Sequence, residues 1–105
     1  MTTLHILNKS PSHPSPASQC KRFYSHNDSI LLIEDAVYYT LTASYQDFIK
    51  SPEFNKHDSH PAIYALKEDI DARGIAATTH KAVKVVNYDG FVELTASHDK
   101  TSSWY

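Results

Sequence analysis

The chain has 105 residues, of which 41% are hydrophobic and 21% charged, and its formal net charge at pH 7 is −2. These values are typical of an ordinary globular protein, and we expect residues 1–105 to form a single domain. The slight negative charge disfavours a general nucleic-acid-binding protein, which normally carries a basic patch, so we expect no direct contact with nucleic acid. No apolar run approaches the roughly 20 residues of a membrane span, and the N-terminus resembles no signal peptide. We therefore expect a cytoplasmic protein without membrane contact.

Four short apolar runs predict β-strands, at residues 4–7, 30–33, 62–66 and 83–86. The second run is continuously apolar, which indicates a strand buried on both faces. Segments of about ten or more residues separate the runs, a spacing that favours parallel strands joined by crossover helices. The sequence thus predicts an α/β fold with a mostly parallel sheet and helices on both faces.

The first two connections have different characters. Residues 10–16 contain three prolines and predict an irregular loop, because proline is excluded from helix interiors. We expect a helix to begin near Ala17 and to carry Cys20 in its first turns. Residues 45–60 are polar and interrupted by Pro52, and they are compatible with a helix or a loop.

The later connections carry clearer helix signals. Residues 67–73 place acids early and a base late, in agreement with the helix dipole, and Gly74 follows as a stop. The last helix should begin near Tyr88 and place Phe91, Leu94 and Thr95 on one face.

Cys20 is the single cysteine of the chain and the one residue that could carry a persulfide. Lys21, Arg22 and His26 lie close in sequence, and basic neighbours or a helix start lower a thiol pKa. The alternative is a small packing residue without chemistry, because cysteine is often buried.

Other polar groups favour structural roles. His57 and His60 have metal-ligand spacing but form an incomplete site, and we expect no metal. His5 lies within the first predicted strand, which favours a hydrogen-bonded structural histidine. The strand ends lack a glycine-rich phosphate loop, so we expect no cofactor.

Acidic pairs follow two of the predicted strands, at 34–35 and 68–69. Acid–base chemistry is one interpretation, since ligands bind at the carboxyl ends of parallel strands. We favour helix capping and dipole matching instead.

Aromatic residues are numerous for so small a core. Tyrosine and tryptophan are enriched in interface cores, so some of them are expected to contact a partner. The candidates are Tyr38, Tyr39, Trp104 and Tyr105.

Four blocks and a C-terminal tryptophan, in this order, resemble the TusB/DsrH family. They are Leu4–Pro11, Ile30–Val37, Tyr64–Gly74, Val86–Thr95 and Trp104. Asp35-Ala36 departs from the Asp-Gly that is usual in the family. The resemblance covers nearly the whole chain and implies a DsrE-like (flavodoxin-like) α/β fold.

The resemblance also implies a function within an assembly. It implies a dimer of heterotrimers with two larger homologous subunits, TusC/DsrF-like and TusD/DsrE-like, together with upstream and downstream sulfur-transfer proteins. One branch passes persulfide sulfur towards 2-thiolation of the tRNA wobble uridine, and the other serves dissimilatory sulfur oxidation. The main sulfur-carrying cysteine belongs to the TusD/DsrE-type subunit, while some DsrH-type members carry a cysteine where Cys20 stands.

We therefore expect a subunit of a sulfurtransferase complex that is not catalytic on its own. A stand-alone homodimeric binding module, unconnected with sulfur, is the alternative from another class.

Overall fold

A parallel sheet organises the computed structural model, which describes residues 1–55 and 61–105. Within these residues all strand pairs are parallel, and the strand order is β4-β3-β2-β1-β5. The prediction of a mostly parallel sheet is confirmed. The strands are β1 (Thr3–Leu7), β2 (Ser29–Leu32), β3 (Ala62–Leu66), β4 (Lys84–Val86) and β5 (Lys100–Trp104).

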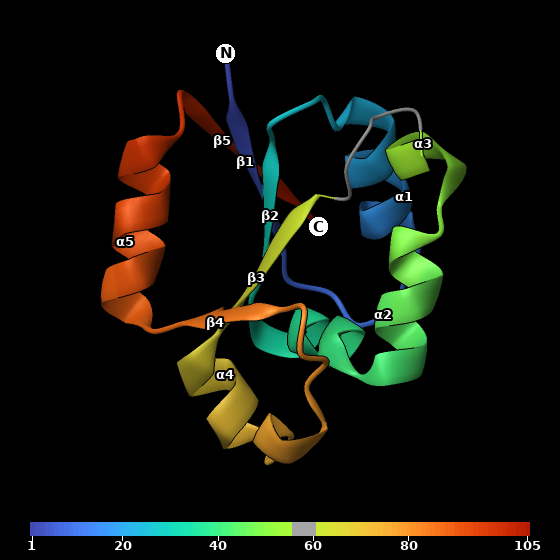
Figure 1. Cartoon of the computed structure of the whole chain (residues 1–105), viewed down its shortest axis with the longest axis vertical. Coiled ribbons are helices and arrows are strands. Elements are labelled where there is room, and N and C mark those ends of the chain that lie inside the picture. Colours follow the sequence, from blue (N-terminus) through green and yellow to red (C-terminus); the bar gives the residue numbers. More distant parts are fainter. Residues whose placement is uncertain (56–60) are drawn as a thin grey trace.

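Helices cover both faces of the sheet unequally (Figure 1). On one face lie α1, α2 and α3, on the other lies α5, and α4 sits beyond the carboxyl ends of the strands. The chain steps from β1 to β4 in one direction and then returns to place β5 beside β1. Because crossovers are right-handed, this reversal puts α5 on the opposite face. The helical elements are α1 (Ser15–Phe23), η1 (Glu34–Thr40), α2 (Thr42–Ile49), α3 (Pro52–Asn55), α4 (Lys67–Ala72), η2 (Ala76–Thr78) and α5 (Tyr88–Ser97), with η marking 3-10 turns.

The two faces hold two hydrophobic clusters of different size. Alternation along the strands sends Leu32 to the face of α1 and Leu31 to the face of α5. The α5-side cluster has three buried members, Leu4, Ile6 and Leu31, and Phe91 and Leu94 of α5 are only partly buried against it. The α1-side cluster is larger and comprises Leu7, Ala17, Cys20, Ile30, Leu32, Ala36, Val37, Tyr39, Tyr45, Phe48, Phe54, Ile63, Ala65, Ile70 and Val83.

The sequence reasoning missed the edge strand β5. Its five residues, Lys-Thr-Ser-Ser-Trp, contain no apolar run and are exposed or half-buried. Backbone pairing along the whole of β1 holds the strand in place, from Thr3 opposite Lys100 to Leu7 opposite Trp104. An edge strand is covered less than a central one, so its composition does not report its presence.

Helix α1 begins at Ser15, two residues before the predicted start, so the expected loop is shorter than residues 10–16. Pro16 occupies the first turn, where proline is tolerated because the backbone N–H there needs no helical partner. The helix turns Pro16, Ala17 and Cys20 towards the sheet. The described part of the polar stretch that begins at residue 45 contributes to α2 and α3, and Pro52 starts α3 rather than breaking a helix.

The last two helices form where the sequence predicts them. Gly74 ends the α4 segment with a φ of +65°, a conformation that suits glycine. Asn87 caps α5 by accepting a hydrogen bond from the Gly90 N–H at 2.9 Å. A Cβ at Gly90 would lie 2.9 Å from the Cβ of Val86, so glycine permits the close approach of α5 to β4. None of the helices in the described ranges has the length and apolar character needed to cross a membrane.

Candidate functional site

A buried polar network on the α1 face joins three strands. His5 of β1 is 2% exposed, and its Nε2 lies 2.8 Å from Oδ2 of Asp28, which precedes β2 and is 4% exposed. Asp28 also accepts hydrogen bonds from the backbone N–H groups of Thr3 and Ser25, each at 2.9 Å. The carboxylate therefore has three donors, which compensate for its removal from water.

Trp104 of β5 completes this network and fixes the state of His5. Its indole N–H donates to Nδ1 of His5 at 3.0 Å. Because an indole N–H can only donate, Nδ1 must accept, and the ring proton resides on Nε2 and points to Asp28. The imidazole lone pair is thus occupied and screened from solvent. The arrangement ties β5 to the sheet but offers no accessible base, in agreement with the predicted structural histidine.

Cys20 lies within the α1-side core. Its side chain is 0% exposed, and burial raises the pKa of the thiol to about 12. Lys21 lowers this pKa, as expected from the sequence, but the effect of burial is larger. The expected lowering of the pKa is therefore wrong, because Cys20 faces the core from the middle of α1 instead of its solvated start.

The four candidate interface aromatics occupy different environments. Tyr39 is 7% exposed and belongs to the α1-side core, so this structure does not present it as a contact surface. Tyr38 is half-buried near Arg73. Trp104 is half-buried and stacks on Phe23, whereas Tyr105 is 79% exposed. Trp104 and Tyr105 line one crevice at the carboxyl end of the sheet.

The acidic pairs at the strand ends have structural partners. Asp35 accepts two hydrogen bonds from the Arg73 guanidinium, at 2.8 and 3.1 Å, and this contact raises the pKa of Arg73. Asp69 accepts from the backbone N–H of Glu34 at 2.6 Å. Glu68 accepts from the N–H of Tyr88, at the start of α5, at 3.2 Å. The contacts of Asp69 and Glu68 with backbone N–H groups agree with the predicted capping role, whereas the ion pair of Asp35 with Arg73 was not predicted.

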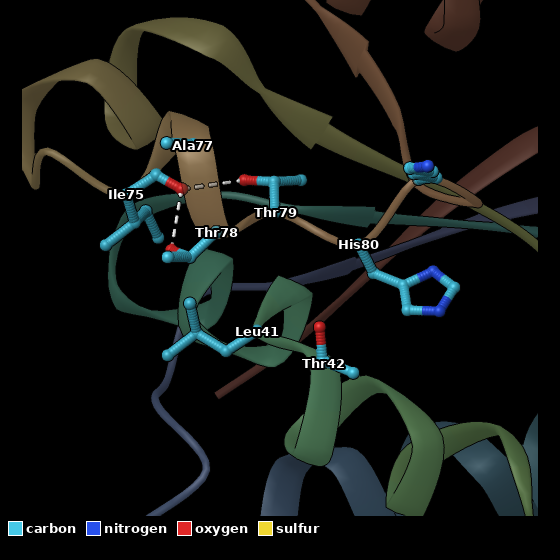
Figure 2. Close-up of a pocket in the computed structure, with 8 residues that line it drawn as sticks. Leu41, Thr42, Ile75, Ala77, Thr78, Thr79 and His80 are labelled. Atoms are coloured by element: carbon cyan, nitrogen blue, oxygen red, sulfur yellow. Dashed lines mark hydrogen bonds between the residues drawn. The ribbon is translucent and has the colours of Figure 1, made fainter.

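A groove of about 790 Å³ lies between the start of α2 and the η2 turn (Figure 2). The hydroxyls of Thr78 and Thr79 both donate to the carbonyl of Ile75 at 3.0 Å, so they offer no free donor to a ligand. The His80 ring stacks on Tyr45, with 4.2 Å between ring centroids. The groove walls are mainly apolar, with Thr42, His80 and Lys81 as further polar members, and this lining suits apolar contact. No motif in the sequence marks this groove.

In the described part of the chain, the His, Cys, Asp and Glu side chains are the candidates for binding a metal ion together. Residues 1–55 and 61–105 contain no group of three His, Cys, Asp or Glu side chains placed to hold a metal ion. His57 and His60 lie outside the described residues.

Comparison with known proteins gives the family. The model of the family described as DsrH-like protein matches residues 9–101. The chain belongs to the TusB/DsrH family. It is 31% identical to protein TusB of Klebsiella pneumoniae (strain 342), over 96% of this chain and 99% of the relative. It is 34% identical to protein TusB of Enterobacter sp. (strain 638), with the same two coverages.

A solved structure supports the fold of this TusB/DsrH-family chain. The crystal structure of the YchN protein from E. coli superposes with a TM-score of 0.69 and covers 99% of this chain and 100% of its own. At 17% identity this likeness concerns the fold alone, and it agrees with the predicted DsrE-like architecture. Membership of the TusB/DsrH family implies a role in sulfur relay.

Proposed function

We propose that this chain is a subunit of a cytoplasmic, heterohexameric sulfur-relay complex that transfers persulfide sulfur for 2-thiolation of the tRNA wobble uridine. Its partners are two larger homologous subunits, one TusC/DsrF-like and one TusD/DsrE-like, in a dimer of heterotrimers. The likeness to TusB proteins across 96% of the chain is the observation that carries this proposal. The upstream donor and the downstream acceptor are further sulfur-transfer proteins.

The role within the complex is architectural. A sulfur carrier must be reachable and at least partly ionised, because the thiolate is the nucleophile. Cys20 has neither property in this structure, with 0% exposure and a pKa of about 12. The principal carrier is expected on the TusD/DsrE-type partner. The partner contacts of this chain involve Trp104, Tyr105 and Tyr38, which retain accessible surface.

The nearest alternative is a DsrH-type subunit in dissimilatory sulfur oxidation. The matching family model is described as DsrH-like, and the family resemblance implies that some DsrH-type members carry a cysteine where Cys20 stands. Genes for sulfite reductase beside the coding gene would favour oxidation, whereas tRNA-thiolation genes would favour the leading proposal.

Co-expression of the three subunits tests the assembly directly. We expect a complex with two copies of each chain, measured by light scattering after size exclusion. Deletion of the gene should lower 2-thiouridine in tRNA hydrolysates, and both the wild type and Cys20→Ser should restore it. A chain that forms a homodimer and ignores both partners would instead support the stand-alone binding module.

A further inference from the structure

A crevice of about 170 Å³ opens at the carboxyl end of the sheet, beside β1 and β5. Asn8 follows β1 directly, Glu34 opens η1, and Trp104 and Tyr105 come from the end of β5. Ile6, a member of the α5-side cluster, forms part of its wall. The crevice lies where the strand order reverses, since β2 and β5 flank β1 on opposite sides. In open parallel sheets, ligands bind at this position.

One of the residues that line this crevice, Asn8, has an unpartnered acceptor. Oδ1 of Asn8 is buried, and no described residue donates a hydrogen bond to it. A buried oxygen without a donor is costly, and native proteins rarely retain one without a reason. The crevice is therefore suited to a group that donates hydrogen bonds.

The charge of the lining residues indicates which kind of hydrogen-bond donor the crevice could bind. Glu34 contributes a carboxylate for which the described residues supply no ion pair, and its φ of +50° is uncommon for a residue with a side chain. None of the described residues that line the crevice is basic, and the neighbouring Lys9 lines a different hollow. The occupant should therefore be a cation.

The volume limits the occupant to a small group. Ligand sites for drug-sized molecules and cofactors measure roughly 300–1,000 Å³, so a nucleotide or flavin is too large here. A single side-chain head group fits. Two acceptors on different elements, with aromatic walls from Trp104 and Tyr105, match the planar, forked guanidinium better than a compact ammonium.

We propose that this crevice receives an arginine side chain from a partner subunit, which donates to the carboxylate of Glu34 and to Oδ1 of Asn8 once the Asn8 amide turns from its buried position into the crevice. This inference rests on the proposed membership of a multi-subunit complex. It assigns a specific contact to the edge of the sheet where Trp104 and Tyr105 remain accessible.

The isolated chain can be tested with ethylguanidinium as a probe of the arginine head group. We expect saturable NMR shifts of the Asn8 side-chain amide and the Trp104 indole N–H, with half-saturation on the order of 1 mM for a ligand of this size. Asn8→Leu should abolish the indole shift, Glu34→Gln should weaken binding about fivefold, and Asn8→Asp should strengthen it. Glu93→Gln, on the exposed surface of α5, is the matched control and should bind as the wild type.

Absence of saturable shifts in the wild type, or equal shifts in Asn8→Leu, would overturn the proposal and leave bound water as the donor to Oδ1. The second measurement is affinity for the two co-purified partner subunits. We expect Asn8→Leu and Glu34→Gln to weaken it at least tenfold, and Glu93→Gln to leave it unchanged.

The failure of this inference can be distinguished from failure of the proposed function. If both variants bind the partners as tightly as the wild type, the arginine contact is rejected while the complex stands. If the wild type itself binds neither partner, the proposed function and the inference fail together.

Discussion

The two faces of the sheet differ in how many helices cover them and in how many side chains they bury. On the α1 face, three helices cover a large cluster and a buried network centred on Asp28. On the α5 face, one helix covers three buried residues and leaves its own Phe91 and Leu94 half-exposed. The proposed arginine crevice borders this thinly covered side through Ile6. The α1 face therefore contributes most of the buried core, whereas the α5 side and its crevice keep accessible surface that partners could contact.

The largest expected effect concerns the polar network of the α1 face. Asp28→Ala removes the acceptor of three donors, two of them buried, and we expect it to lower the free energy of unfolding by about 3–5 kcal/mol. Urea denaturation of the isolated chain measures this loss. The control is Asp99→Ala, because the exposed Asp99 also accepts from a backbone N–H, that of Thr2. A similar loss in the two variants would contradict the assignment of Asp28 as the buried anchor.

A matched pair of leucines compares the two clusters themselves. Leu32→Ala on the α1 face should cost about 3–4 kcal/mol, because the side chain is fully buried. Leu94→Ala on α5 should cost only about 1–2 kcal/mol, because the side chain is half-buried and alanine favours the helix. Unfolding free energies of both variants provide the test, and equal losses would break the comparison.

Alkaline pH should reveal the burial of Cys20. The folded pKa of about 12 lies above the reference value of 9.0, so the folded state holds the thiol proton more tightly than the unfolded state. The contribution of this proton to the free energy of unfolding is fully present below pH 9. It is lost as the pH rises towards 12, by about 1.4 kcal/mol per pH unit. Burial also raises the pKa of Tyr39, which adds to the alkaline loss.

Urea denaturation at pH 8, 9 and 10 should therefore show a shallower decline in Cys20→Ala than in the wild type. In the folded protein the thiol should also react with iodoacetamide far more slowly than in urea. Fast alkylation of the folded wild type would show that Cys20 is accessible and would restore it as a candidate carrier.

The smallest expected effect concerns the cap of α5. Asn87→Ala removes the hydrogen bond to the Gly90 N–H and should lower the free energy of unfolding by about 1 kcal/mol. Asn87→Asp keeps a capping oxygen and should retain most of the stability. Thermal unfolding of the two variants, measured side by side, separates the cap from other effects of the substitution.

The sequence predicts the central strands well because burial on both faces dictates their composition, as in residues 29–32. It does not predict β5, whose position depends on backbone pairing with β1 and whose surface is partly open. Helices α4 and α5 are predictable because local signals such as Gly74 mark their ends.

The candidate site was less accessible to sequence reasoning. His5 could be assigned a structural role, but its two partners lie 23 and 99 residues away along the chain. Cys20 shows the opposite difficulty, because its basic neighbours in sequence suggested a reactive thiol while tertiary burial decided its pKa. Nothing in the sequence marked Asn8 as a candidate binding residue, since only the folded structure shows that its side-chain oxygen lacks a hydrogen-bond donor.

The position of Trp104 gives the protein an intrinsic optical reporter. Trp104 is the single tryptophan of the chain, its indole N–H is bound to a buried histidine, and its ring stacks on Phe23. It also lines the crevice. The fluorescence of the unlabelled chain therefore comes largely from one ring, and its emission wavelength reports the detachment of β5 and the arrival of a partner at the sheet edge.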